Sequence, residues 1–404
     1  MTETDKPTEA ETATTSKKRG ALNRLGAGMA RLTRAKQKFT MPNPESGLKI
    51  VIVTDAWKPQ LNGVVTTLDT LGRILTAKGN KVMYITPLDF KSMPMPTYPE
   101  IRLSLFPNRK VAKMINDFKP DAVHIATEGP LGRAARRFCR RRSYPYTTSF
   151  HTRFAEYTYE RFRFPVEWGY ALLRDFHKHG ETMMVATPGL MDELEGRGFT
   201  NMKLWARGVD TKIFKPTPSD VMADLPKPIF TYVGRLAVEK SLEDFLDLDL
   251  PGTKVLVGAG PQEAELRVKY KGKNVHFAGP QFGEELVKYY SATDVFVFPS
   301  RTDTFGLVNV EALACGVPVA AYPVRGPAEI MADAPAGAGC LDEDLKTACM
   351  TALENRDPEA CRQHSMKFNW EAGARQFIAN LEIPGFDEEF WLRSAQMIED
   401  PFLP

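Results

Sequence analysis

Two series of alternating strand-like and helix-like segments constrain the fold of this chain most. The first series begins with KIVIVT (49–54), continues through the helical stretch VVTTLDTLGRILTAKG (64–79), and reaches KVMYIT (81–86). A strand, a helix and a second strand in this order form a βαβ unit, whose two strands are parallel. Further strand-like runs follow at 121–126, 146–150 and 183–187. The first half of the chain therefore predicts a parallel sheet covered by helices.

A second series of the same kind follows the polar, proline-rich stretch 215–228, which is typical of a linker. Two Rossmann-like, doubly wound α/β domains facing a central cleft are the simplest interpretation. We also expect C-terminal helices to return to the first domain. The expected divisions are a disordered, basic amphipathic tail (1–46), a first domain (47–206), a linker (207–228), a second domain (229–380) and a return segment (381–404).

Composition narrows the class of protein. No stretch approaches the roughly 18 consecutive apolar residues of a membrane span, and the N-terminus lacks the apolar core of a signal peptide. The five cysteines are scattered and form no CxxC pair, which favours reduced thiols in a cytosolic protein over a disulfide framework or a zinc site.

Charge is distributed unevenly along the chain. Residues 17–38 carry eight Lys and Arg and no acid, so the net charge of +3 leaves about −5 for the rest of the chain. The body is therefore not expected to bind nucleic acid. Leucines and a methionine at helical spacing in 20–38 indicate a weak basic amphipathic helix that contacts an anionic membrane surface, and a solvated flexible tail is the alternative.

The loops after the predicted strands are where open α/β sheets bind ligands, because helix N-termini point outward there. Asn62-Gly63 follows the first strand, and a positive φ in this dipeptide would bring the backbone close to a ligand. His151 follows the strand at 146–150, where an imidazole can bond a substrate or carry a proton near neutral pH. An ordinary tight turn and a structural histidine are the alternatives.

Two groups of residues in the second domain predict a site for a nucleotide diphosphate. Gly234 ends a strand, Arg235 follows, and Lys240 falls on the next helix. The planar guanidinium of Arg235 and the compact ammonium of Lys240 would therefore lie beside a helix N-terminus. Further along, Asp303 stands eight residues before Glu311. The helix that starts after Phe305 and Gly306, near Leu307, would offer N–H groups to phosphate oxygens, while Glu311 could accept hydrogen bonds from a ribose diol.

Taken together, these segments resemble family 4 of the retaining glycosyltransferases, which have the two-Rossmann-domain GT-B fold. The resemblance covers about residues 48–380 and rests on VGRLAVEK (233–240) and on the acid-x7-Glu motif (303–311) followed by ALACGVPV. It implies that Arg235 and Lys240 bind the diphosphate of the donor and that Glu311 holds its ribose.

The resemblance also assigns the remaining site residues. Asp303 would contact the transferred sugar, although the family usually has Glu there, and this departure could mean another donor sugar or a lower activity. His151 aligns with the family's histidine near the reacting centre, and only Gly63 matches its usual Gly-Gly. The implied catalytic residues are His151, Asp303, Arg235 and Lys240, and the implied donor-binding residues are Gly63, Gly234, Arg235, Lys240, Asp303, Phe305, Gly306, Leu307 and Glu311.

Cations that meet the charge developing on the leaving diphosphate make a metal unnecessary, so we expect neither a metal nor another cofactor. Such enzymes are thought to retain configuration through attack on the same face of the sugar. The sequence also contains a DxD, the manganese signature of the other common glycosyltransferase fold, at 247–249. It follows a helix and not a strand, so we interpret it as surface charge.

The acceptor is indicated less directly. Residues 150–170 are rich in aromatics and 133–142 hold six arginines, which suggest either packing and a solvated basic face or a membrane-facing edge. The candidate acceptor and membrane residues are Arg136, Arg137, Arg140, Arg141 and Tyr157. The segments FHTRF and DAWKPQLNG resemble the branch with diacylglycerol glycosyltransferases and GDP-mannose-dependent mannosyltransferases.

The resulting expectation is a bacterial, peripheral enzyme on the inner face of the cytoplasmic membrane. It would move a hexose or uronic acid from a nucleotide sugar, with a UDP-sugar favoured, to a lipid acceptor such as diacylglycerol. The alternatives are a GDP-mannose-dependent α-mannosyltransferase, a soluble transferase, a nucleotide-sugar epimerase of the same build, and an inactive relative that binds sugar nucleotide.

Overall fold

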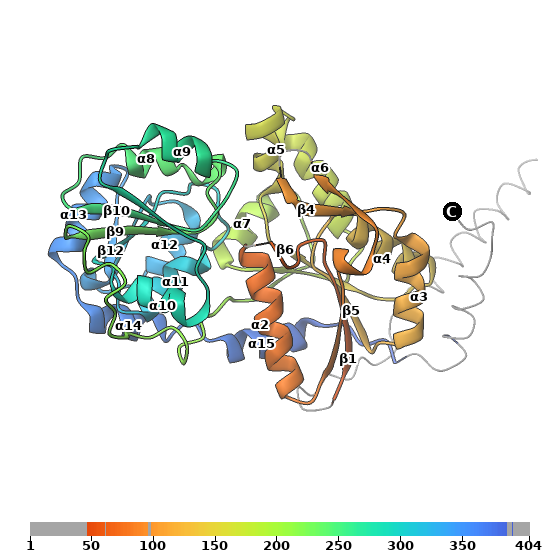
Figure 1. The fold of residues 1–404 in the computed structure, drawn as a ribbon. Helices are drawn as coiled ribbons and strands as arrows, with labels where there is room; N and C mark the ends of the chain where they lie inside the picture. Colours follow the sequence, from red (N-terminus) through yellow and green to blue (C-terminus); the bar gives the residue numbers. More distant parts are fainter. Residues whose placement is uncertain (1–46, 61, 96–97, 386–389, 391–404) are drawn as a thin grey trace, which may run out of the picture.

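The computed structural model describes residues 47–60, 62–95, 98–385 and 390, and shows two α/β domains side by side (Figure 1). The predicted basic tail (1–46) and nearly all of the segment beyond residue 385 lie outside these residues. No helix in the described part of the chain is long and apolar enough to span a membrane.

The first domain contains a parallel sheet of six strands in the order β2-β1-β5-β6-β7-β8. Its βαβ units form as the sequence predicts, and Lys49 to Val53 pair in register with Lys81 to Ile85. The strands are β1 (Lys49–Val53), β2 (Lys81–Ile85), β5 (Ala122–Ile125), β6 (Thr147–Phe150), β7 (Thr182–Val185) and β8 (Met202–Leu204). The helices are α2 (Gly63–Ala77), α3 (Asn108–Phe118), α4 (Pro130–Arg141), α5 (Phe154–Phe162), α6 (Val166–His177) and α7 (Pro188–Gly196).

A separate antiparallel hairpin interrupts the first domain between β2 and α3. It consists of β3 (Ser92–Met95) and β4 (Tyr98–Ser104), and a short 3-10 turn, η1 (Pro87–Asp89), precedes it. The sequence analysis did not predict this hairpin. Its inner face contributes to the cleft described below.

The second domain has a parallel sheet of six strands in the order β11-β10-β9-β12-β13-β14. The strands are β9 (Ile229–Val233), β10 (Thr253–Val257), β11 (Val275–Gly279), β12 (Val295–Phe298), β13 (Val319–Ala321) and β14 (Gly339–Leu341). The helices are α8 (Leu242–Leu246), α9 (Glu263–Lys269), α10 (Gly283–Ser291), α11 (Leu307–Ala314), α12 (Arg325–Met331), α13 (Leu345–Glu354) and α14 (Pro358–Ser365), with 3-10 turns η2 (Val238–Lys240) and η3 (Ala336–Ala338).

The strand order explains where a ligand can bind. In each sheet the chain reverses its direction of travel at one pair of neighbouring strands, β1 with β5 and β9 with β12. The loops that leave such a pair diverge, and the crevice between them is the usual ligand site of this architecture. Both switch points face the space between the domains.

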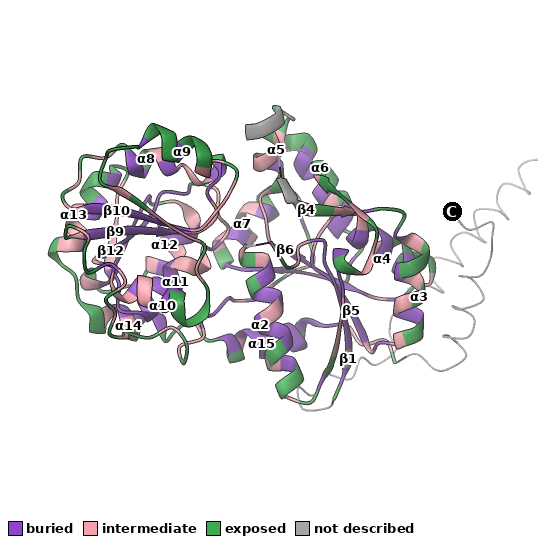
Figure 2. Cartoon of the chain, in the orientation of Figure 1, coloured by how far each residue is buried: buried purple, intermediate pink, exposed green. Residues whose placement is uncertain are grey.

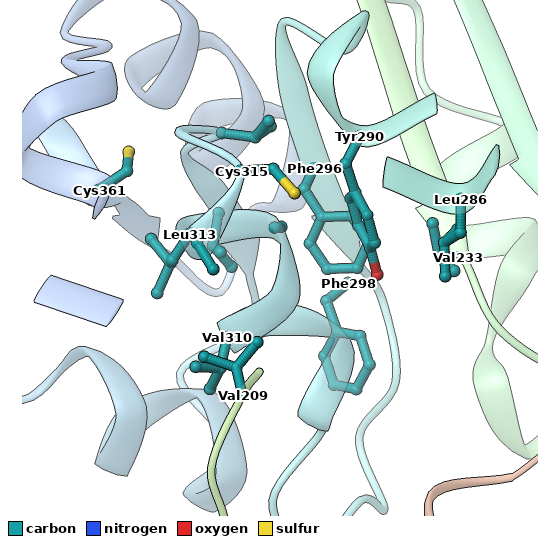
Figure 3. Packing of buried hydrophobic residues seen from close by; sticks show 14 of the residues in the cluster. Val209, Val233, Leu286, Tyr290, Phe296, Phe298, Val310, Leu313, Cys315 and Cys361 are labelled. Atoms are coloured by element: carbon teal, nitrogen blue, oxygen red, sulfur yellow. The ribbon is translucent and has the colours of Figure 1, made fainter. Parts of the chain in front are cut away.

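Buried apolar side chains cover both faces of each sheet, which explains the continuous apolar strand sequences. The central strands are coloured as buried (purple), whereas the helices around them also carry exposed residues (green) (Figure 2). In the second domain, Tyr290 of α10 packs beside Phe296 of β12, with ring centroids 5.8 Å apart, in the same buried cluster as Val310 of α11 (Figure 3). This packing fixes the helix that begins at the cleft.

The C-terminal part of the chain returns to the first domain, as expected. Helix α15 (Trp370–Asn380) lies beside α2 (Figure 1), and the Asn380 side-chain amide donates to the Leu204 carbonyl oxygen at 2.9 Å. The return thus takes place before the expected boundary at residue 380. The predicted place of Lys240 on a helix is wrong, because Lys240 ends the 3-10 turn η2 and Ser241, with a φ of 50°, separates η2 from α8.

Candidate functional site

A cavity of about 2040 Å³ lies between the two domains and is lined by loops from both. The first domain contributes His151, Tyr157, Gly63 and Arg136 from the predicted set. The second domain contributes all of its predicted residues, which are Gly234, Arg235, Lys240, Asp303, Phe305, Gly306, Leu307 and Glu311. The fold therefore brings residues that are far apart in sequence to one cleft.

Lys240 and Asp303 form a buried ion pair in the cleft. The Lys240 ammonium nitrogen lies 2.7 Å from each carboxylate oxygen of Asp303. Burial opposes the charge of both groups, but the Lys240 ammonium holds the pKa of Asp303 below its ordinary value. The pKa of Lys240 is raised, since the attraction of Asp303 outweighs burial. Both groups are therefore charged at neutral pH.

Arg235 is oriented by a neighbour from its own motif. One guanidinium nitrogen of Arg235 lies 2.9 Å from a carboxylate oxygen of Glu239, which is itself buried. A guanidinium held by a buried carboxylate keeps a fixed direction, so its other N–H groups can meet a ligand with little loss of freedom. Arg235 and Lys240 together place two cations on the wall of the cleft.

The N-terminus of α11 is the second element suited to an anion. Gly306 precedes it with a φ of 82°, and no side chain caps the first turn. A β-carbon at Gly306 would lie 2.5 Å from the Asn309 amide nitrogen, so only glycine fits there. The backbone N–H groups at the start of α11 line the same cavity as Lys240 and can bind phosphate oxygens.

The loop after β1 differs from its prediction. Asn62 is extended, with a φ of −156°, and its side-chain oxygen accepts hydrogen bonds from Val64 N and Val65 N, both at 3.1 Å. The expected positive φ of the Asn-Gly dipeptide is therefore wrong, because Asn62 caps α2 instead. Gly63 nevertheless faces the second domain: a β-carbon there would lie 3.8 Å from the Leu307 side chain.

Glu311 lies inside the first turns of α11, with 9% of its surface exposed. Burial raises the pKa of its carboxyl group to about 7, against a smaller lowering effect of the hydrogen bond that the Tyr290 hydroxyl donates at 3.0 Å. Part of the Glu311 population is thus neutral near pH 7. The carboxyl group can accept hydrogen bonds from a diol in the cavity that it lines.

His151 is held by a residue that the sequence analysis missed. A guanidinium nitrogen of Arg207 lies 3.3 Å from His151 Nδ1. Arginine can only donate, so Nδ1 must accept and the proton of the neutral ring sits on Nε2. Burial, and then the Arg207 charge, keep the pKa of His151 well below its ordinary value. Nε2 is buried without a hydrogen-bond partner among the described residues and is a donor for a ligand in the cleft.

Arg207 itself is 4% exposed and stacks 3.9 Å above the Trp205 ring. Burial lowers the pKa of its guanidinium to about 9. The only sequence signal for this residue was a cation inside the apolar run LWARGV, directly after β8.

Asp55, which follows β1, was also missed by the sequence analysis. Its buried carboxylate accepts a hydrogen bond from Leu131 N at 2.9 Å and so fixes the position of α4.

The candidate acceptor and membrane residues separate into two groups. Tyr157 lies in the cleft, where burial raises the pKa of its hydroxyl against a smaller lowering effect of the Lys240 charge. Arg136 also lines the cleft but donates to the Asp175 carbonyl oxygen at 2.6 Å. Arg137, Arg140 and Arg141 do not line the cavity and lie exposed on α4.

The DxD at 247–249 lies at the end of α8, where Asp247 accepts a hydrogen bond from the Tyr270 hydroxyl at 2.8 Å. Within the described ranges, no three His, Cys, Asp or Glu side chains are grouped as a metal site would require. The charged groups that line the cavity include the cations Arg235 and Lys240 and the buried carboxyl group of Glu311.

This combination of two Rossmann-like domains and a cationic cleft at their switch points defines a class of nucleotide-binding protein, and comparison with known proteins identifies the family. Residues 61–213 match the family model "Glycosyltransferase Family 4", and residues 227–355 match "Glycosyl transferases group 1". The chain belongs to family 4 of the glycosyltransferases, and its fold is GT-B, as the resemblance in the sequence implied.

Three relatives illustrate the range of the family. Sulfoquinovosyl transferase of Arabidopsis thaliana is 30% identical over 74% of this chain and 66% of its own length. A GDP-mannose-dependent α-mannosyltransferase of Mycobacterium tuberculosis is 27% identical over 70% and 82%. The α-monoglucosyldiacylglycerol synthase of Acholeplasma laidlawii is 26% identical over 67% and 79%.

A solved structure with the same fold is the sucrose-phosphate synthase of Thermosynechococcus elongatus. It has a TM-score of 0.66 and 23% identity, over 81% of this chain and 96% of that one. At this identity the likeness concerns the fold alone. The matched region spans just under two thirds of the Arabidopsis relative, so the activity of this chain is argued from its own site.

Proposed function

We propose that this chain is a retaining, metal-independent glycosyltransferase that moves a hexose or uronic acid from a nucleotide sugar, with a UDP-sugar favoured, to a lipid such as diacylglycerol. The observation that carries the proposal is the convergence in one cleft of Arg235, Lys240, the uncapped N-terminus of α11 and Glu311. These groups suit the diphosphate and the ribose of such a donor.

The proposed reaction uses the cleft as follows. The bond between the anomeric carbon and the diphosphate oxygen breaks, and negative charge develops on the leaving diphosphate. Arg235, Lys240 and the N–H groups of α11 stabilise this charge where it appears, so no metal or other cofactor is required. The acceptor hydroxyl bonds the anomeric carbon on the same face, and its proton passes to the leaving phosphate oxygen.

Two residues would position the sugar. His151 Nε2–H is a donor without a protein partner among the described residues, so we assign it to a sugar hydroxyl and not to general-base catalysis. Asp303 is already bonded to Lys240, which would keep its carboxylate charged while it accepts hydrogen bonds from the sugar. When the donor binds, the Lys240 ammonium would contact both the Asp303 carboxylate and the diphosphate.

The lipid acceptor is supported by a relative whose name specifies a diacylglycerol product, and by the charge of this chain. The eight cations of residues 17–38 and the exposed arginines of α4 suit an anionic membrane surface on the cytoplasmic side. The proposed location is therefore peripheral on the inner face of a bacterial cytoplasmic membrane.

A second candidate is an α-mannosyltransferase that uses GDP-mannose, favoured by the Mycobacterium tuberculosis relative. The donor base separates the two. We would measure the melting temperature with UDP, GDP and ADP, and then the transfer of radiolabelled sugar from the preferred donor to diacylglycerol in the presence of EDTA. A ligand that binds only the folded state raises the melting temperature.

We expect one base to stabilise the protein, a loss of that shift in Glu311→Ala, and a labelled lipid in the presence of EDTA. No shift with any nucleotide would overturn the donor site. Nucleotide binding without any turnover would identify an inactive relative, and turnover only with a water-soluble acceptor would identify a soluble transferase. A converted sugar nucleotide in the absence of acceptor would identify an epimerase.

A further inference from the structure

One corner of the first domain exposes large apolar side chains to solvent. We call it the 87–110 corner, because it comprises η1, the β3–β4 hairpin and the first turn of α3. Phe106 is 94% exposed and Leu88 68% exposed, and Met93 and Leu105 are exposed as well. Leu105 N donates to the Lys91 carbonyl oxygen at 2.8 Å, so these segments form one connected surface.

Phe106 is unusual in its backbone as well as in its exposure. Its φ of 48° lies in the left-handed region, which a bulky side chain rarely adopts. An aromatic residue that is both strained and solvated stabilises nothing within the folded chain. Such a residue is most simply explained by a contact that forms when something else covers it.

Positive charge surrounds these apolar side chains. Lys91, Arg102, Arg109 and Lys110 are exposed, and residues 87–110 contain two acids, Asp89 and Glu100. The Asp89 carboxylate is directed inward, where it accepts a hydrogen bond from Thr86 N at 2.9 Å. Lys110 bonds the Asp89 carbonyl oxygen and lies 5.0 Å from the Phe90 ring centroid, which holds its charge at this surface.

The inner face of the same corner reaches the donor cleft. Met95, Ile101, Leu103, Pro107 and Asn108 line the cavity that also contains Lys240 and Asp303. Met93 and Leu103 are direct partners across the hairpin, and side chains at such positions share one face of the strands. An apolar path thus leads from the exposed corner to the site of transfer.

We propose that the 87–110 corner is the membrane-docking surface of this protein, with Phe106 and Leu105 entering an anionic phospholipid bilayer while the surrounding cations contact its headgroups. This inference rests on the proposed lipid acceptor and locates its entrance. Aromatic side chains at the level of the headgroups and nearby cations are the two features that bind a protein to such a surface. The acceptor headgroup would then enter the cleft along the inner face of the hairpin.

The test is co-sedimentation of the full chain with phosphatidylcholine vesicles, with and without phosphatidylglycerol. The informative variant is Phe106→Asn, because asparagine tolerates the left-handed backbone and removes the aromatic ring without straining the turn. The matched control is Val268→Asn on α9 of the second domain, where Val268 is 78% exposed.

We expect the unmodified chain to bind the anionic vesicles, Phe106→Asn to bind them about tenfold or more weakly, and Val268→Asn to bind as the unmodified chain does. A Lys91→Gln/Arg109→Gln variant should lose about fivefold per cation on anionic vesicles. Unchanged binding of Phe106→Asn would overturn the proposal and leave the tail or α4 as the contact. The absence of vesicle binding by the unmodified chain would also overturn it.

The melting-temperature shift with nucleotide is measured on the same variants. We expect Phe106→Asn to keep it, since Phe106 does not line the cavity. A chain that binds vesicles but no nucleotide would contradict the proposed function alone, whereas a chain that binds nucleotide but no vesicle would contradict the docking surface alone.

Discussion

Glu311 combines a binding role with a cost in stability. Its pKa of about 7 in the folded protein lies above the ordinary value of 4.5, mainly because the carboxyl group is buried. Between these two pH values the folded state binds more protons than the unfolded state, so stability falls as pH rises from about 4.5 to 7 and stays lower above that. The difference corresponds to about 3 kcal/mol.

Glu311→Gln should therefore melt several degrees above the unmodified chain at pH 8, and the two melting temperatures should converge as the pH falls below about 4.5. Glutamine can still accept the Tyr290 hydrogen bond but cannot take on the buried charge. The same variant should lose most of its nucleotide-induced shift. A difference in melting temperature that is the same at both pH values would show that the pKa of Glu311 is not raised in the folded state.

Arg207 controls the proton of His151. Arg207, His124 and His177 all act electrostatically on the imidazole, and the Arg207 guanidinium, whose pKa of about 9 keeps it charged near neutral pH, also contacts Nδ1. Arg207→Met removes both the donor to Nδ1 and the repulsion of a second cation. The pKa of His151 should then rise, so the acidic limb of the pH–rate profile should move to higher pH.

The tautomer of His151 can be read directly from ¹⁵N chemical shifts in long-range ¹H–¹⁵N spectra. We expect a protonated Nε2 and an unprotonated Nδ1 in the unmodified chain, a mixture in Arg207→Met, and an intermediate case in Arg207→Lys, which keeps the charge without the planar fork. If Arg207→Met retained the single tautomer and the original profile, Arg207 would have only a packing role beside Trp205.

At the scale of elements, the position of α11 depends on Gly306. An alanine there would adopt a left-handed backbone and would also approach Asn309 and the Phe298 ring, to 2.5 and 3.0 Å. Gly306→Ala should lower stability by about 2–4 kcal/mol and weaken nucleotide binding, because the N-terminus of α11 must move. Melting temperatures and calorimetric titration with nucleotide measure the two effects.

Gly272→Ala is the matched control for this prediction. Gly272 has a similar φ of 78°, but a β-carbon there meets no atom within 4 Å, and the residue does not line the cavity. Its replacement should cost about 1 kcal/mol and leave nucleotide binding intact. Equal effects of the two substitutions on binding would mean that α11 does not contact the ligand.

Apart from the three-residue strands β8, β13 and β14, the strands of both sheets were predictable from the sequence because parallel strands are buried on both faces and appear as unbroken apolar runs. The β3–β4 hairpin was not, since SMPM contains a proline and shows little strand periodicity. The break at Ser241 could not be predicted either, because the residues on both sides of it suit a helix and the turn is imposed by packing. Arg207 shows the same limit, because its contact with His151 spans 56 positions and has no local signal.

At the scale of the whole molecule, the cleft is complete only while the domains are close together. The Thr304 hydroxyl donates to the His151 carbonyl oxygen at 3.0 Å, across the cleft. Away from the cleft, Arg325 of α12 lies 3.6 Å from Glu193 of α7, which Arg153 holds at 2.6 Å. The second contact acts on the relative position of the domains without touching the donor site.

Arg325→Glu should therefore favour a more open arrangement. The original pair is partly exposed and worth at most about 1 kcal/mol, but the reversed charge adds repulsion from Glu193 and from the carboxylate of Glu329 nearby. We expect a larger radius of gyration in solution scattering and a lower kcat/KM. Both effects should weaken in high salt, because screening reduces the repulsion.

Arg267→Glu is the control for charge reversal, since Arg267 pairs with Glu263 on the same helix of the second domain. Its scattering curve should match that of the unmodified chain. If Arg325→Glu lowered kcat/KM without changing the radius of gyration, the residue would act locally on the cleft. If it changed neither, the contact of Thr304 with His151 would be sufficient to hold the domains together, and closure would depend on the cleft itself.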